Sequence, residues 1–194
     1  MEYMLKILVI DENQTRTQEL CTQLIHSGYQ VAAVLSAADN LPNQVAAFKP
    51  DVILVDTDSP SRDILEHLAV MDQTAPRPVV LLGSDRSNDT IRHVVEAGVS
   101  TYVVDNLDPA RLQPIIDIAV ARFRHYQELR GKLAEAQRQL DERKMLDQAK
   151  TLLMKHRKLD EAAAYALLRK TAMSRGKTMG AVARELVESA SLLL

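Results

Sequence analysis

The chain has 194 residues, enough for one or two domains with a buried core. Its composition, 46% hydrophobic and 26% charged, is typical of a soluble globular protein, and the absence of any apolar run near about 18 residues excludes a membrane-spanning helix. The formal net charge of −2 hides an asymmetry, because residues 1–120 carry 8 Lys and Arg against 17 Asp and Glu, and residues 121–194 carry 16 against 9. A basic second half predicts a polyanionic partner, although a solvated helical face is the alternative.

Short apolar runs alternate with helical patterns through the first half of the chain. The runs that predict strands are residues 5–10, 31–35, 51–56, 78–82 and 101–104. This alternation predicts an α/β fold with a doubly wound, five-stranded parallel sheet. Ligands of such sheets bind beyond the carboxyl ends of the strands. The polar residues at those ends are Asp11, Glu12, Asp56, Ser84 and Asp105.

Cys21 is the single cysteine, so no intramolecular disulfide forms and a reducing compartment is expected. It falls on a helical pattern, and we expect it to be a small core residue. No signal-peptide pattern precedes the first strand, which favours a cytoplasmic protein.

A long helical pattern follows the last strand. Asp108 and Pro109 are a good N-cap and first residue, and Pro114 predicts either a kink or a later start. The pattern then continues past Gly131 to about residue 156. Apolar residues at alternating spacings of three and four predict a coiled-coil seam and a homodimer. The seam residues are Tyr126, Leu129, Leu133, Ala136 and Leu140. The alternative is a helix that packs on its own chain.

Acidic side chains at neighbouring strand ends repel one another unless a cation lies among them. Mg²⁺ accepts such oxygen ligands and keeps waters and a phosphate in its shell. An Asp beside the ion can accept a phosphoryl group, and the Ser84 hydroxyl could bind a phosphate oxygen.

Residues 5–120 resemble a response-regulator receiver domain, on the strength of Leu8–Glu12 (LVIDE), Asp51–Pro60 (DVILVDTDSP) and Tyr102. The resemblance implies that Asp56 is the phosphoacceptor, that the Asp58 carbonyl joins the carboxylates as a metal ligand, and that Tyr102 is the switch aromatic. The implied carboxylate ligands of Mg²⁺ are Asp11, Glu12 and Asp56.

Two positions depart from the receiver pattern. Asp105 stands where the family has a lysine, and an acid there would repel a phosphoaspartate. Gly83 stands at the place of the switch Ser or Thr, with Ser84 one residue later as a substitute. We therefore expect a receiver fold that serves as a docking surface for another protein, with phosphorylation as the alternative.

The carboxy-terminal residues 146–194 predict three short helices, the second capped by Asp160 and the third by Thr178. Their apolar stripe is read as a three-helix core, so function is assigned to the charges, nine basic against five acidic in residues 145–194. The candidate RNA-binding residues are Lys150, Arg169, Lys170, Arg175 and Lys177. The charges alone leave DNA and RNA both open.

The tail looks like an ANTAR domain across Gln148–Met154, Asp160–Tyr165 and Leu167–Met173. The resemblance implies a non-enzymatic antiterminator that binds paired hairpins in leader mRNA. The front half, including Val103–Asp105, is most similar to nitrate-assimilation regulators of the NasT type, which implies control by a nitrate- or nitrite-sensing partner. The alternative function is a phosphorylation-switched regulator that binds DNA.

The predicted domains are a receiver-like domain at 1–120, a helical coiled-coil linker at 121–145 and an ANTAR RNA-binding domain at 146–194.

Overall fold

The computed structural model describes residues 4–11, 14–36, 41–104 and 111–191. The chain divides into two compact units, residues 1–127 and 128–194. Among the described residues, no helix combines the length and the apolar character that a bilayer crossing requires.

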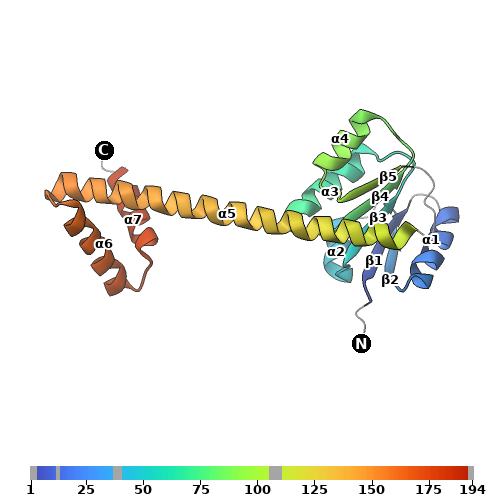
Figure 1. Ribbon diagram of the computed structural model, residues 1–194, viewed down its shortest axis with the longest axis horizontal. Helices are drawn as coiled ribbons and strands as arrows, with labels where there is room; N and C mark the ends of the chain where they lie inside the picture. The colour runs from blue at the N-terminus through green and yellow to red at the C-terminus, as the bar shows by residue number, and fades with distance from the viewer. Residues whose placement is uncertain (1–3, 12–13, 37–40, 105–110, 192–194) are drawn as a thin grey trace. The chain divides into compact units, whose positions relative to one another are not determined.

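The first unit is a five-stranded parallel sheet with helices on both faces (Figure 1). The strand order β2-β1-β3-β4-β5 is that of the flavodoxin-like class of doubly wound sheets, which confirms the predicted fold. The elements are β1 Lys6–Asp11, α1 Gln14–His26, β2 Gln30–Leu35, α2 Leu41–Phe48, β3 Val52–Asp56, α3 Arg62–Thr74, β4 Val79–Gly83, α4 Asn88–Glu96, β5 Thr101–Val104 and the start of α5 (Leu112–Arg157).

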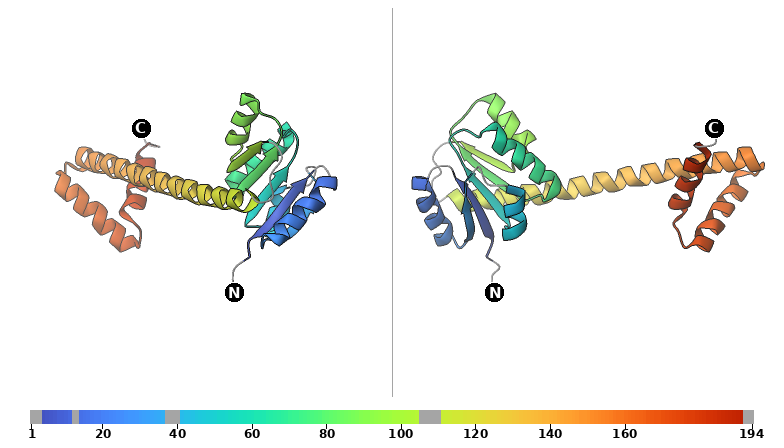
Figure 2. Two further views of the ribbon diagram at one scale, coloured as in Figure 1. Left: turned by 45° about the vertical axis from the view of Figure 1, so that its right-hand side comes forward. Right: turned by 180° about the vertical axis from the view of Figure 1, so that it is seen from behind.

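The central strands are apolar between their ends because both of their faces are buried. Helices lie on both faces of the sheet (Figure 2). In β1, Leu8 and Ile10 pack with α2, α3 and α4, while Ile7 and Val9 pack with α1 and α5. The same alternation holds in β3 and β4, so each face has its own core cluster. From α5, Leu112 completes the second cluster together with Ile116 and Ala119.

Local details refine the expected boundaries. Strand β4 ends at Gly83, one residue later than predicted. The described part of α5 begins at Leu112, so Pro114 lies in the first turn, where a backbone N–H has no intrahelical acceptor to lose. The proposed N-cap Asp108 and first residue Pro109 lie outside the described residues. Cys21 packs against the second cluster but is only half-buried, so it lies at the margin of the core.

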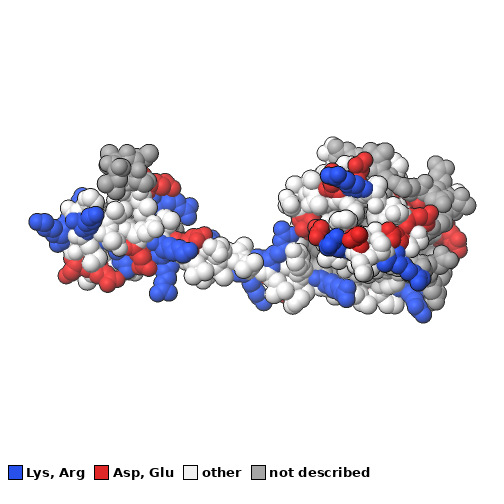
Figure 3. All heavy atoms as spheres, turned by 90° about the horizontal axis from the view of Figure 1, so that it is seen from above, with Lys and Arg blue, Asp and Glu red and all other residues white. Residues whose placement is uncertain are grey.

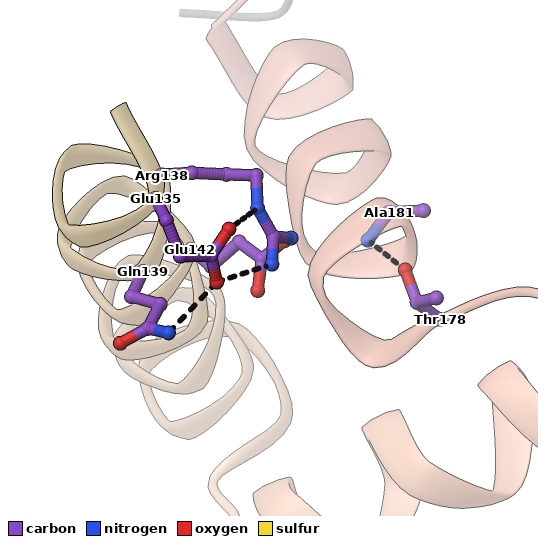
Figure 4. Close-up of polar contacts among 6 residues, drawn as sticks. All are labelled: Glu135, Arg138, Gln139, Glu142, Thr178 and Ala181. Atoms are coloured by element: carbon purple, nitrogen blue, oxygen red, sulfur yellow. Dashed lines mark hydrogen bonds and ion pairs between the residues drawn. The ribbon is translucent and has the colours of Figure 1, made fainter. Parts of the chain in front are cut away.

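The second unit consists of the end of α5, α6 (Glu161–Arg175) and α7 (Met179–Ser191). Both predicted caps are confirmed. The Asp160 carboxylate accepts a hydrogen bond from the Ala163 N–H at 2.7 Å. The Thr178 hydroxyl accepts one from the Ala181 N–H at 3.2 Å, as Figure 4 shows.

Small side chains bring these helices close together. The core of the unit is Ala149, Leu153, Ala164, Leu168, Ala172, Val182 and Ala183. The first turn of α7 approaches α5 so closely that a Cβ on Gly180 would lie 3.4 Å from the Cγ of Glu142. The Glu142 carboxylate also pairs with Arg138, which pairs in turn with Glu135 (Figure 4). A carboxylate beside a helix N-terminus interacts favourably with the helix dipole, and such an interaction stabilises a helix by about 0.3–1 kcal/mol.

Candidate functional site

An open groove of about 530 Å³ runs along the exposed face of α6. Its lining residues are Tyr165, Ala166, Arg169, Lys170, Met173 and Ser174. They form two rows at spacings of four residues, so the side chains within each row are neighbours on the helix surface. Arg169 lies midway along one row, between Tyr165 and Met173, and Lys170 lies midway along the other, between Ala166 and Ser174.

The exposure of this face follows from the packing of the opposite one. Ala164, Leu168 and Ala172 are buried in the core of the unit, which turns the following residue of each turn toward solvent. Tyr165 is 49% exposed and Met173 is 74% exposed. This face therefore combines an exposed aromatic ring and a thioether with two cations, and we take it as the candidate binding surface.

Three of the five predicted RNA-binding cations are already engaged in ion pairs. Lys150 Nζ lies 2.9 Å from an Asp147 oxygen and 2.7 Å from a Glu161 oxygen. Arg175 lies 3.5 Å from the Glu185 carboxylate, which also accepts a hydrogen bond from Lys177. The pairs of Lys150 with Glu161 and of Arg175 with Glu185 join different helices, and Lys177 joins the turn before α7 to that helix. The pair of Lys150 with Asp147 lies within α5.

Arg169 and Lys170 differ from these three cations. Within the described part of the chain, neither has an acidic partner within ion-pair distance. Their charges therefore remain available to a polyanion. The ion pairs across helices could not be read from the sequence, because Glu161 and Glu185 lie 11 and 8 residues from the lysines that they bind.

The second unit does not present one unbroken basic surface. Figure 3 shows Lys and Arg side chains projecting from several sides of it, interspersed with Asp and Glu. The excess of positive charge in this half is thus divided between pairs that hold helices and cations that face solvent.

The acidic edge of the sheet brings two of the predicted carboxylates together. Asp11 and Asp56 are partners in the parallel register of β1 and β3, and they are 8% and 5% exposed. From α1, the Thr17 hydroxyl donates a hydrogen bond to Asp11. Glu12, the third predicted carboxylate ligand, and Asp105 lie outside the described residues.

The described oxygens do not make up a complete magnesium site. The Asp58 carbonyl, expected as a metal ligand, accepts hydrogen bonds from the Ser84 N–H at 3.0 Å and from the Ser84 hydroxyl at 2.9 Å. These two donors match the two lone pairs of a carbonyl oxygen. Within the described ranges, no group of three His, Cys, Asp or Glu side chains is placed to hold a metal ion. Magnesium at this edge stays a prediction.

The predicted switch residues make different contacts from each other. The Ser84 hydroxyl is committed to the Asp58 carbonyl, whereas the Tyr102 hydroxyl donates to the Asp85 carbonyl at 2.7 Å. Burial, and then the negative charge of Asp85, raise the pKa of the Tyr102 phenol. The ring of Tyr102 is therefore held against the loop that follows β4.

The predicted coiled-coil seam is exposed along the middle of α5. Tyr126 is 53%, Leu129 50%, Leu133 70% and Leu140 54% exposed. Exposure of large apolar side chains to water is unfavourable, and their heptad spacing matches the packing of a second helix against them.

Two protein families match separate parts of the chain. The response regulator receiver domain matches residues 7–117, and the ANTAR domain matches residues 134–187. The receiver match covers the five strands except for Lys6, the first residue of β1, and the ANTAR match contains the α6 groove.

Individual relatives agree with these matches. The chain is similar to the transcriptional regulatory protein PdtaR of Mycobacterium tuberculosis, with 26% identity over 184 residues that cover 95% of this chain and 90% of that protein. A shorter stretch of 61 residues is 39% identical to the nitrate regulatory protein of Klebsiella oxytoca and covers 31% of this chain and 15% of that protein. The fold resembles the receiver domain of a modulated diguanylate cyclase from Desulfovibrio desulfuricans, with a TM-score of 0.56, 18% identity, and coverage of 64% and 99% of the two chains.

The ion pair around Glu185 predicts a measurable titration. The hydrogen bond from Lys177, with the charges of Lys177 and Arg175, holds the pKa of Glu185 below its ordinary value. This depressed pKa means that the contribution of Glu185 to folding is present above its unfolded-state pKa and is lost as the pH falls through its folded-state pKa. Lys177→Met should raise the pKa of Glu185 toward the ordinary value, as followed by carboxyl-carbon NMR, whereas Lys177→Arg should keep it low. An unchanged Glu185 pKa in Lys177→Met would contradict the pairing.

Proposed function

Because the chain belongs to the response regulator receiver family and also carries an ANTAR domain, we propose that it is a transcription antiterminator that binds paired hairpins in leader mRNA through the ANTAR unit. The observation that carries the proposal is the α6 groove, in which the cations Arg169 and Lys170 lie beside the exposed ring of Tyr165. The role is regulatory, with no catalytic residue assigned.

The groove offers the two kinds of contact that an RNA loop needs. Cations without acidic partners can contact backbone phosphates, and each phosphate that they neutralise releases counterions. An exposed tyrosine ring supplies a flat surface on which an unpaired base can stack. Unstacked bases are displayed by hairpin loops, whereas the bases of duplex DNA are held inside the helix. This pairing of chemistries favours loop RNA over duplex DNA.

Antitermination would follow from stabilising one RNA fold at the expense of another. A protein that binds the paired hairpins adds its binding free energy to that fold. A terminator hairpin that shares the same nucleotides would then fail to form. The proposal does not depend on a magnesium ion or a phosphoryl group at Asp56.

Groove substitutions should weaken RNA binding in distinguishable ways. Arg169→Ala and Lys170→Ala should each lower the slope of log affinity against log salt by about one, because each removes one phosphate contact. Tyr165→Ala should cost about 1–3 kcal/mol of binding free energy and leave the salt slope unchanged, because it removes stacking only. Lys155→Ala, which removes an exposed cation that does not line the groove, is the matched control. Equal losses in Lys155→Ala and Lys170→Ala would show that the RNA face lies elsewhere.

Gel-shift titrations of the full chain should separate the two classes of nucleic acid. A leader hairpin RNA should bind more tightly than duplex DNA of the same sequence. A preference for the duplex, together with labelling of Asp56 by acetyl phosphate, would instead support a phosphorylation-switched DNA-binding regulator.

We also propose that the exposed seam of α5 forms a homodimer. Leu133 is the most exposed of the large seam residues, and a charge there would have to be buried between two helices. Leu133→Asp should therefore shift sedimentation toward the monomer. The matched control is Ala134→Asp, which places the same charge on the neighbouring exposed residue, off the seam. An unaltered oligomer in Leu133→Asp would remove the dimer from this proposal.

A nitrate- or nitrite-sensing protein is the proposed partner of the receiver-like unit. The match to the Klebsiella oxytoca nitrate regulatory protein supports this assignment, as do the acid at position 105 and the glycine at position 83. Affinity capture from the native organism, with the full chain as bait, should retain a partner whose recovery changes when nitrate is added. Recovery of the same amount of partner with and without nitrate would contradict the proposed nitrate-sensing partner.

A further inference from the structure

The ring of Tyr102 occupies the space directly beside Gly83. A Cβ added to Gly83 would lie 2.8 Å from the Tyr102 hydroxyl oxygen and 2.9 Å from its Cε2 atom. Ordinary contacts between carbon atoms are about 3.5–4.0 Å, so even an alanine at this position would collide with the ring. Gly83 does not have a positive φ, unlike Gly98 and Gly176. The glycine is therefore needed here for the ring and not for the backbone conformation.

The ring is held in this position by a connected set of hydrogen bonds. The Tyr102 hydroxyl donates to the Asp85 carbonyl at 2.7 Å. The Asp85 carboxylate accepts from the Ser87 N–H at 2.8 Å and from the Thr90 hydroxyl at 2.6 Å. Ser87 is also the N-cap of α4. Through these contacts, β5, the loop after β4 and the first turn of α4 are tied together.

A second attachment holds the other end of the same loop. Ser84 directs both its N–H and its hydroxyl to the Asp58 carbonyl, in the loop after β3. The segment from Gly83 to Ser87 is thus fixed on one side by Asp58 and on the other by Tyr102. A loop that changed its conformation would have to break the hydrogen bonds from Ser84 to the Asp58 carbonyl and from the Tyr102 hydroxyl to the Asp85 carbonyl.

We propose that Gly83 makes the position of Tyr102 permanent, so that the loop between β4 and α4 does not respond to the chemical state of the Asp56 carboxylate. A side chain at the end of β4 would compete with the ring for one space, and that competition would create two alternative states. With glycine there is no competitor, and the loop has a single arrangement. A ligand shifts an equilibrium only where two states differ in their affinity for it. The receiver-like unit therefore presents one fixed surface, whether or not Asp56 carries a phosphoryl group.

Fluorine NMR of the full chain labelled with 3-fluorotyrosine tests this directly, because the chain has only 5 tyrosines. The Tyr102 resonance is assigned as the signal that disappears in Tyr102→Phe. It should keep its position in Asp56→Asn, and also when Mg²⁺ and beryllofluoride are added as a phosphoryl mimic. Gly83→Ala should move it, because the new methyl group displaces the ring. Movement of the Tyr102 signal with beryllofluoride or in Asp56→Asn would overturn the proposal.

Thermal unfolding provides a test that does not need the Gly83→Ala spectrum. Gly83→Ala should lower the midpoint temperature strongly when Tyr102 is present and much less in the Tyr102→Ala background, where the collision with the ring is absent. A smaller loss remains expected there, because the Thr57 carbonyl oxygen would lie 3.2 Å from the new Cβ. Gly131→Ala is the matched control, since a Cβ at that position on α5 meets no atom within 4 Å. Equal losses in the two backgrounds would show that the ring does not depend on Gly83.

Discussion

The receiver-like unit depends on the burial of both faces of its central strands. Because β1, β3 and β4 are apolar on both sides, helices must cover each face, and α5 has to begin against one of them. That packing places the carboxyl ends of β1 and β3 side by side at the reversal of the strand order, where Asp11 meets Asp56. The acidic edge is therefore a consequence of how the core is closed, and it exists whether or not it takes part in phosphoryl chemistry.

The loop after β4 bears on how the receiver-like unit is controlled. Gly83 makes room for the ring of Tyr102, and Ser84 is bound to Asp58. Under the proposal made above, these two local features together remove the alternative arrangement that a phosphorylation signal would select. A fixed docking surface of this kind suits control by a partner protein, which recognises shape, better than control by a small chemical change at Asp56.

In the helical unit, the same residue types have two different roles. Lys150, Arg175 and Lys177 neutralise acids from neighbouring helices and hold the bundle, while Arg169 and Lys170 face solvent beside Tyr165. Ion pairs of this type are exposed to solvent and contribute little to the free energy of unfolding, so their value lies in the geometry that they fix. Charge counting alone would weight the five cations equally. The packing of α6 shows which two are available to a polyanion.

The sequence alone determined the class of each part, because apolar periodicity reports which faces are buried. It predicted five strands, the long α5 helix and the caps at Asp160 and Thr178. The helix and the caps depend on contacts between residues close in the chain, and the strands follow from apolar runs that mark burial on both faces. Tertiary structure alone decided which groups meet across elements. Three kinds of contact between residues that are not neighbours in the chain illustrate this. The Tyr102 ring lies against Gly83, the Asp58 carbonyl accepts two hydrogen bonds from Ser84, and Lys150 and Lys177 pair with Glu161 and Glu185. Such contacts are fixed by packing in three dimensions, and no local pattern in the chain encodes them.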